Sequence, residues 1–367
     1  MRRLTVVQLL PALDAGGVER STLEIANALV RAGHRAVVVS AGGRLLPSLE
    51  ALGAEHVALD IGRKSPLALR HVPALRRLFR DADIVHARSR LPAWLAWLAL
   101  RGMGDGGPRF VTTAHGLNSP SRYSAIMARG ERVACVSRTV RAHLLRHYPR
   151  VDPARRGGVK RGIAGADKPP APLPEPDARA RAAALHPALG GAGPLLLLPG
   201  RGTRLKGHAD AIALLAALRA GGDDVRLWLP GALQAGRDDY LDELRALARS
   251  AGVDAALAIT APTAAIAEAY AASDLVLQLS RKPEAFGRTV IEALSVGRPV
   301  LGWAHGGVGE LLAELQPAGA VPAFDAAALA TRARALLDAP PSPPPAMPYT
   351  LRAMQEATLA LYGSMAT

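Results

Sequence analysis

Continuous apolar runs alternate with helix-periodic segments along the chain, and this pattern limits the possible fold more than any other feature. The first two runs are residues 4–10 and 36–40, and residues 17–32 between them place apolar side chains at helical spacing. Strands that are apolar at every position are buried on both faces, as in parallel sheets covered by helices. The pattern therefore predicts an α/β fold with parallel sheets.

The alternation occurs twice, on either side of a segment rich in proline and alanine. A chain of 367 residues is also long for a single domain. We therefore predict an N-terminal domain over residues 1–164, a linker over 165–190, a C-terminal domain over 191–348 and a final helix over 349–367 that packs back toward the N-terminal domain. Further strands are expected at 56–59, 83–87, 109–116, 132–137, 194–200, 225–231, 256–260, 274–280 and 299–303, and further helices at 66–80, 91–101, 206–220 and 240–251.

The positive charge is confined to one half of the chain. Residues 1–177 contain 28 Lys and Arg against 14 Asp and Glu, whereas residues 178–367 contain 17 of each, so the first half carries the whole net charge of +14. The asymmetry favours an anionic partner for this half, either a membrane surface or a phosphorylated acceptor. The alternative is an arginine-rich composition without a partner. Aromatic-interleaved RNA-binding motifs are missing from the sequence, so nucleic acid is not an expected partner.

No apolar run is long enough to cross a bilayer; residues 91–100 form the best candidate. Gln8 and Pro11 interrupt the apolar start, which favours a first buried strand over a signal peptide. A cytoplasmic protein is expected, with peripheral attachment to the inner face of the cytoplasmic membrane as the alternative. The basic amphipathic helix at 66–80 could lie on such a surface or pack as an ordinary surface helix, and Pro73 would kink or interrupt it.

Ligands of parallel α/β sheets bind in loops that follow strands, so these loops contain the candidate site residues. The first strand leads into Gly16 and Gly17, which let a ligand approach the backbone at the start of a helix. In the second half, Arg201 and Lys206 follow a strand within GRGTRLKG, and the chain has only five lysines. Two cations beside a helix start could hold a diphosphate. A solvated basic loop is the alternative, and the spacing does not match a P-loop.

A pair of glutamates brackets the start of a helix near the end of the second half. Glu284 follows a strand, Phe286 and Gly287 begin the helix, and Glu292 lies eight residues after Glu284. Two carboxylates placed on one side of a helix start can bind vicinal hydroxyls such as those of a sugar or ribose. Interaction with the helix dipole, or simple solvation, is the alternative.

Taken together and in order, the motifs resemble those of glycosyltransferase family 4. The resemblance covers nearly the whole chain and includes the two-glutamate signature and the glycine- and lysine-bearing loop of that family. The matching segments are GGVERS (16–21), DIVHARS (83–89), TTAHG (112–116), VSRTVRAHL (136–144), GRGTRLKG (200–207), EAFGRTVIEA (284–293), GRPV (297–300) and GGVGE (306–310).

The resemblance implies a GT-B fold, in which two Rossmann-like domains carry parallel sheets that face a central cleft. It also implies a retaining enzyme that moves a sugar from a nucleotide-sugar donor (UDP-, GDP- or ADP-linked) to a glycan or lipid-linked acceptor. Lipopolysaccharide core or another surface polysaccharide is the expected acceptor class. No bound cofactor and no metal are expected. Asp81 and Asp83 match a metal-binding DxD pattern, but they precede a strand and so indicate a structural turn.

The family's site residues map onto this sequence one by one. Arg201 and Lys206 would hold the diphosphate, Glu284 the donor sugar and Glu292 the ribose. His115 would lie near the donor sugar. For His86, a contact with the ligand and a purely structural role both remain open. Backbone approach to the donor is implied for Ala285, Phe286 and Gly287. Gly16 and Gly17 would let the first loop approach the donor phosphates or the acceptor.

The sequence departs from the family after the domain junction, where an Asn-Gly-Val/Ile-Asp segment is usual. Arg161 and Ala164 occupy the positions of its asparagine and aspartate, which weakens any assignment there. Two other functions remain open: a GT-B nucleotide-sugar epimerase, which needs no acceptor, and a non-catalytic subunit that binds a nucleotide or a glycan.

Overall fold

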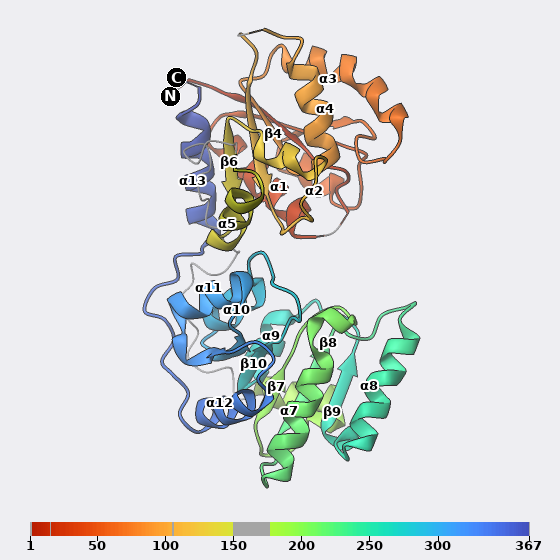
Figure 1. The fold of residues 1–367 in the computed structure, drawn as a ribbon, viewed down its shortest axis with the longest axis vertical. Helices are drawn as coiled ribbons and strands as arrows, with labels where there is room; N and C mark the ends of the chain where they lie inside the picture. The colour runs from red at the N-terminus through yellow and green to blue at the C-terminus, as the bar shows by residue number, and fades with distance from the viewer. Residues whose placement is uncertain (1, 15, 105, 150–176, 367) are drawn as a thin grey trace. The chain divides into compact units, whose positions relative to one another are not determined.

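The computed structural model describes residues 2–14, 16–104, 106–149 and 177–366, which fold into two compact units (Figure 1). The N-terminal unit comprises residues 1–162 together with 351–367, and the C-terminal unit comprises residues 163–350. The hinge positions Arg161 and Ala164, and the first part of the predicted linker, lie outside the described residues. The last part of that linker forms a helix, α6 (Asp177–Leu185), and a short 3-10 turn at Pro187–Leu189.

The N-terminal unit is built on a six-stranded parallel sheet with the order β3-β2-β1-β4-β5-β6. This is the strand order of a Rossmann sheet, in which the order reverses between β1 and β4. The strands are β1 (Thr5–Leu9), β2 (Arg35–Ser40), β3 (Glu55–Ala58), β4 (Ile84–Ala87), β5 (Arg109–Ala114) and β6 (Arg132–Cys135). The helices are α1 (Gly17–Arg31), α2 (Leu46–Ala51), α3 (Val72–Phe79), α4 (Arg90–Leu100), α5 (Arg138–His147) and α13 (Leu351–Gly363).

The C-terminal unit repeats this topology, with the order β12-β11-β10-β7-β8-β9 and the reversal between β7 and β10. Both sheets are parallel, so the predicted pair of Rossmann-like domains is confirmed. The strands are β7 (Leu195–Leu197), β8 (Arg226–Pro230), β9 (Leu257–Thr260), β10 (Leu275–Gln278), β11 (Val300–Trp303) and β12 (Ala320–Val321). After α6 come α7 (His208–Ala220), α8 (Asp238–Ser250), α9 (Ile266–Ala272), α10 (Arg288–Ser295), α11 (Gly306–Leu315) and α12 (Ala326–Asp338).

Neighbouring residues of the central strands belong to different cores, as expected of a sheet buried on both faces. Val6 packs into a cluster with α1 and α13, whereas Val7 packs into a second cluster with α3 and α4. Both side chains are fully buried. The period-two geometry of a strand thus explains why the runs are apolar at every position.

Two predicted helices begin differently from the expectation, and each has a local cause. The helix expected over residues 66–80 is divided into a 3-10 segment (Pro66–His71) and α3, because Pro73 lies in the first turn of the new helix, where its missing N–H costs nothing. The helix expected from Lys206 starts at His208. Gly207 has a φ of 77° and separates it from the preceding turn. None of the helices among the described residues is long and apolar enough to span a membrane.

The last helix, α13, packs on α1 within the N-terminal unit (Figure 1). Its fully buried Tyr362 places the hydroxyl 2.6 Å from Nδ1 of His86 at the end of β4. The other ring nitrogen, Nε2, lies 2.6 Å from the hydroxyl of Thr113 on β5. Burial raises the pKa of Tyr362 to about 12 and lowers the pKa of His86 well below its usual value, so both groups are neutral near pH 7.

We expect Tyr362→Phe to lower the free energy of unfolding by about 1–3 kcal/mol, because it leaves a buried polar atom of His86 without its partner. Denaturant unfolding of the full chain measures the effect. Tyr123→Phe is the matched control. Tyr123 is 38% exposed, so removal of its hydroxyl leaves no buried polar atom without a partner. Equal stability of the two variants would contradict a structural role for the Tyr362 hydroxyl.

Candidate functional site

The loops that follow β7 and β10 lie at the topological switch point of the C-terminal unit, where α/β sheets bind their ligands. The loop after β7 contains Arg201 and Lys206, and the loop after β10 contains Glu284. Arg201 is exposed, whereas Lys206 and Glu284 are partly buried. The strand order therefore places the predicted cations and the first glutamate in neighbouring loops.

Lys206 and Glu284 form an ion pair, with Nζ 2.7 Å from Oε1. The same carboxylate accepts a hydrogen bond from the amide of Gln278 at 3.1 Å and another from the hydroxyl of Ser280. The backbone carbonyl of Ser280 in turn lies 2.8 Å from Nε2 of His305. Glu284 is thus held at a fixed position by groups from β10 and from the loops after β7 and β10.

Glycines let the loop after β10 fit closely against the start of α11. The N–H of Gly307 donates to the carbonyl of Glu284 at 2.7 Å, and a Cβ at Gly307 would lie 2.5 Å from the carbonyl oxygen of Phe286. Gly306 has a φ of 59° and Gly287 a φ of 101°, backbone conformations that favour glycine. This contact fixes the backbone of Ala285, Phe286 and Gly287 beside Glu284.

The second glutamate, Glu292, lies on α10 and is bonded to other groups. Its carboxylate accepts a hydrogen bond from the hydroxyl of Tyr270 at 2.8 Å and forms an ion pair with Arg288. Burial, followed by the charge of Glu292, raises the pKa of Tyr270 well above its usual value, so this hydroxyl stays a donor. The helix begins at Arg288 rather than at Phe286, so Glu284 lies in the loop before the helix and only Glu292 lies on it.

His208 begins α7 directly after the loop that carries Lys206. Its side chain is fully buried, and burial lowers its pKa to about 4. Nδ1 of the ring lies 3.4 Å from the hydroxyl of Tyr240 on α8. His208 therefore supports the loop as a neutral group near pH 7 and adds no charge to the site.

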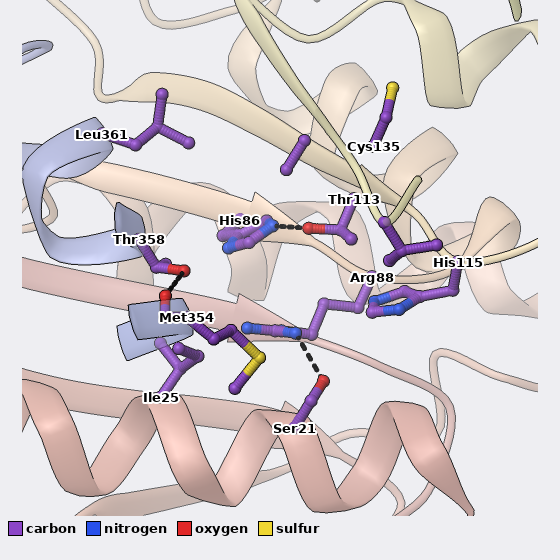
Figure 2. Close-up of a pocket in the computed structure, with 12 residues that line it drawn as sticks. Ser21, Ile25, His86, Arg88, Thr113, His115, Cys135, Met354, Thr358 and Leu361 are labelled. Carbon is purple, nitrogen blue, oxygen red and sulfur yellow. Dashed lines mark hydrogen bonds between the residues drawn. The ribbon is translucent and has the colours of Figure 1, made fainter. Parts of the chain in front are cut away.

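A second cluster of predicted residues lies in the N-terminal unit, at the carboxyl ends of β4 and β5 (Figure 2). His115 lines a pocket together with His86, Arg88, Thr113 and Ser21 of α1. Gly16 precedes α1 with a φ of 149°, and a Cβ there would lie 2.5 Å from the carboxylate of Glu19. Gly17 is the first residue of that helix.

The structure therefore groups the predicted residues by unit. Lys206, Glu284 and the backbone of residues 285–287 come together in the C-terminal unit, where Arg201 is exposed and Glu292 is bonded separately. Gly16, Gly17 and His115 belong to the N-terminal unit. The sequence interpretation missed the partners of these residues: Gln278, Ser280, Tyr270, Arg88 and Tyr362. A polar residue that ends or follows an apolar strand, as Gln278, Ser280 and Arg88 do, was the available signal.

The DxD pattern has a structural role. Oδ2 of Asp83 accepts a hydrogen bond from the backbone N–H of Thr5 at 2.7 Å, and Arg2 forms an ion pair with the same carboxylate. These contacts tie the start of β4 to the start of β1, at the edge of the sheet opposite to the pocket. Within the part of the chain that the structure describes, no three His, Cys, Asp or Glu side chains gather as a metal-binding group.

Two family models match this chain, one in each half. The family model for Glycosyltransferase Family 4 matches residues 15–163, and the model for Glycosyl transferases group 1 matches residues 188–348. The chain is a family 4-like glycosyltransferase. No curated protein matches it.

The solved structures similar to this glycosyltransferase include two whose descriptions name a glycosyltransferase. One from Rickettsia africae ESF-5 is 26% identical with a TM-score of 0.86, and the match covers 100% of this chain and 99% of that one. HepE from Anabaena, solved with UDP and glucose, is 18% identical with a TM-score of 0.75, covering 99% and 100%. WaaG, a glycosyltransferase of lipopolysaccharide biosynthesis, is 19% identical with a TM-score of 0.65, covering 98% of both chains. These matches confirm the predicted GT-B fold.

The buried His208 predicts a dependence of stability on pH. Its pKa is about 4 in the folded state and 6.5 as the reference value, so between these two pH values the unfolded state binds the proton and folding is disfavoured. We expect the free energy of unfolding to fall by about 2 kcal/mol from pH 7 to pH 5 on account of this residue.

Denaturant unfolding at both pH values, on wild type and His208→Gln, measures this contribution. The variant should lose about 2 kcal/mol less than wild type over the interval. His71→Gln, at a partly exposed histidine of the N-terminal unit, is the control for removing an imidazole. An unchanged pH dependence in His208→Gln would show that His208 is not buried as a neutral group.

Proposed function

We propose that the chain is a retaining glycosyltransferase that moves a sugar from a nucleotide-sugar donor to a glycan or lipid-linked acceptor. The observation that carries the proposal is the ion pair between Lys206 and Glu284 at the switch point of the C-terminal unit. A cation and an acid side by side suit a ligand that presents both phosphates and hydroxyl groups. A nucleotide sugar presents both.

In the absence of a ligand, Lys206 and Glu284 neutralise each other. A donor diphosphate would offer Lys206 a stronger partner, because two phosphates carry more charge than one carboxylate. The exposed Arg201 can reach out to the same diphosphate without breaking a buried contact. Glu284 would then be released to accept hydrogen bonds from the sugar hydroxyls, while Gln278 and Ser280 keep its position.

The remaining donor contacts follow from the same loops. The backbone of residues 285–287 lies beside Glu284, so it would approach the sugar and the adjacent phosphate. Glu292 would bind the ribose hydroxyls; Tyr270 and Arg288 orient its carboxylate. These diphosphate, sugar and ribose contacts come from residues of the C-terminal unit.

The reaction requires charge to be moved from the sugar to the leaving nucleotide. As the bond between the anomeric carbon and the phosphate oxygen breaks, the carbon becomes oxocarbenium-like and the diphosphate gains negative charge. Lys206 and Arg201 stabilise that charge electrostatically, which lowers the barrier. In a retaining reaction without a protein nucleophile, the acceptor hydroxyl attacks on the face that the phosphate leaves, and the phosphate takes up its proton. His115 would lie near the donor sugar.

UDP is the first nucleotide to test, since HepE was solved with UDP and with UDP-glucose. A ligand present at about 100 times its dissociation constant adds about 2.7 kcal/mol to stability, which thermal unfolding detects readily. We expect Lys206→Ala to bind UDP-glucose about tenfold to a hundredfold more weakly, because a hydrogen bond to a charged group contributes about 1.5–3 kcal/mol. UDP-, GDP- and ADP-sugars are compared.

Lys282→Ala is the matched control, because Lys282 is an exposed lysine two residues before Glu284. Equal loss in both variants would assign the effect to net charge and would contradict a diphosphate site at Lys206. Conversion of the nucleotide sugar to its epimer without an acceptor would replace the transferase proposal by the epimerase alternative. Binding without release of nucleotide in the presence of any glycan acceptor would favour a binding subunit.

The acceptor class proposed is lipopolysaccharide core or another surface polysaccharide, reached at an anionic membrane surface. The 3-10 segment Pro66–His71 and α3 support the membrane contact: Leu67 is 62% exposed and Leu69 53% exposed, among several arginines. Exposed leucines surrounded by cations are typical of helices that rest on anionic lipid. WaaG acts in lipopolysaccharide biosynthesis, which agrees with this acceptor class.

We expect the protein to sediment with vesicles that contain anionic lipid and to remain in the supernatant with neutral vesicles. The double variant Leu67→Ser, Leu69→Ser should reduce sedimentation, because it removes the apolar part of the contact and keeps the charge. Leu233→Ser, at a 38% exposed leucine of the C-terminal unit, is the control. Equal recovery with neutral and anionic vesicles would contradict the membrane proposal.

A further inference from the structure

A buried arginine without an acidic partner lies in the pocket of the N-terminal unit (Figure 2). Arg88 follows β4 and is only 5% exposed. Its Nε donates to the side-chain oxygen of Gln8 at 2.9 Å, and Nη1 donates to the hydroxyl of Ser21 at 3.0 Å. Both partners are neutral, and the hydroxyl of Tyr362 lies close enough to influence the pKa of Arg88.

The guanidinium therefore keeps both its charge and unused donors. It has five N–H donors, of which the hydrogen bonds to Gln8 and Ser21 engage two. No carboxylate of the described residues forms an ion pair with it; burial lowers its pKa, and the charge of Glu24 on α1 raises it. Burying a cation without a counter-ion costs several kcal/mol. An anion bound to Arg88 at this ligand-binding edge of the sheet would supply the missing counter-ion.

The pocket has the size and the lining of a site for a small anionic group. Its cavity of about 30 Å³ holds the equivalent of about two water molecules, enough for the oxygens of one carboxylate or phosphate but not for a sugar ring. Figure 2 shows the Arg88 side chain lying across this space, between Ser21 of α1 and Met354 of α13. The polar groups around it are hydroxyls, the thiol of Cys135 and two imidazoles, of which that of His86 is neutral; no acidic side chain lines the pocket.

The neighbouring groups hold Arg88 in place rather than compete for the anion. His86 uses one ring nitrogen for Tyr362 and the other for Thr113. Burial, with Arg88 and His115 nearby, lowers the pKa of His86, so it adds no second charge. A buried guanidinium held by hydrogen bonds to two neutral oxygens has little conformational entropy left to lose on binding. Bidentate binding of a planar carboxylate or of phosphate is the geometry that suits it best.

We propose that Arg88 recognises an anionic group of the acceptor, either a carboxylate or a phosphate monoester, so that the acceptor is an acidic or phosphorylated glycan. The proposal rests on the proposed transferase function, because only a transferase has an acceptor. It gives the excess positive charge of the N-terminal half one defined role, and it places the anion at the switch point between β1 and β4. The diphosphate and ribose contacts assigned above belong to the other unit, whereas His115, assigned near the donor sugar, lines the same pocket as Arg88.

Isothermal titration with sugar probes tests the site without knowledge of the natural acceptor. Glucose 6-phosphate, glucuronate and glucose are titrated into the full chain with UDP saturating and with ionic strength held constant by NaCl. UDP occupies the proposed diphosphate loop, so a second phosphate cannot bind there. We expect binding of glucose 6-phosphate, glucuronate or both, and none of glucose. Binding of only one of the two anions identifies the phosphate or the carboxylate as the recognised group.

Ser21→Asp is the decisive variant, because it places a carboxylate beside Nη1 of Arg88 and supplies the counter-ion from within the chain. We expect binding of the anionic probe to weaken at least tenfold, while UDP binding is unchanged and the melting temperature is equal or higher. Ser48→Asp, at an exposed serine of α2, controls for the added negative charge. Arg88→Gln is the second variant and should abolish binding of the probe.

The outcomes separate this inference from the proposed function. If UDP binds to wild type but neither anion does, the anion site is overturned and the donor site stands. Anion binding that Ser21→Asp, Arg88→Gln and Ser48→Asp all leave unchanged also overturns it. Anion binding lost in the first two variants, without any binding of UDP, supports the anion site and contradicts the donor assignment.

Discussion

The structure depends on parallel strands that are buried on both faces. Because a sheet of this kind has helices on either side, its strand ends are the natural place for polar chemistry, and each unit offers them at one reversal of strand order. The loops after β7 and β10 carry the Lys206–Glu284 pair, and the loops after β4 and β5 carry the polar pocket of the N-terminal unit. The same topology thus produces two polar sites of different character: one in which opposite charges are paired, and one in which a single cation is buried.

The ion pair of Lys206 and Glu284 and the buried cation of Arg88 suit different kinds of ligand. Lys206 and Glu284 are partly exposed and paired with each other. In the proposed function, this pair would exchange one partner for another when a ligand binds. Arg88 is buried and hydrogen-bonded to neutral oxygens from β1 and α1, so its position is set before any ligand arrives. Exchange of partners suits a substrate that must enter and leave as a nucleotide. A fixed guanidinium suits the recognition of one group on a larger molecule.

Much of this architecture follows from the sequence, and the parts that do not follow have physical causes. The apolar runs predicted the strands and their parallel arrangement, because burial on both faces leaves no polar positions. Motif resemblance predicted Lys206 and Glu284 as members of one site, yet their direct contact joins residues 78 positions apart and needed the fold. Tyr362 lies 276 residues from His86 and carries no local signal, so the sequence could not reveal this bond. The helices near Gly207 and Pro73 begin later than predicted. The conformation of these two residues determines where each helix starts, and such local geometry is decided within one turn.

The final helix has a consequence for how the protein can be divided. Because residues 351–367 complete the N-terminal unit, the chain passes between the two units twice, and the unit is discontinuous in sequence. A fragment that ends at residue 162 would leave the apolar face of α1 uncovered and would open the enclosure around His86 and Arg88 from the α13 side. A self-sufficient N-terminal unit would have to be made as a circular permutant, in which the last helix is joined by a short linker to the first strand. The fold therefore couples completion of the first unit to synthesis of the last residues of the chain, so this unit can reach its native core only after the second has emerged.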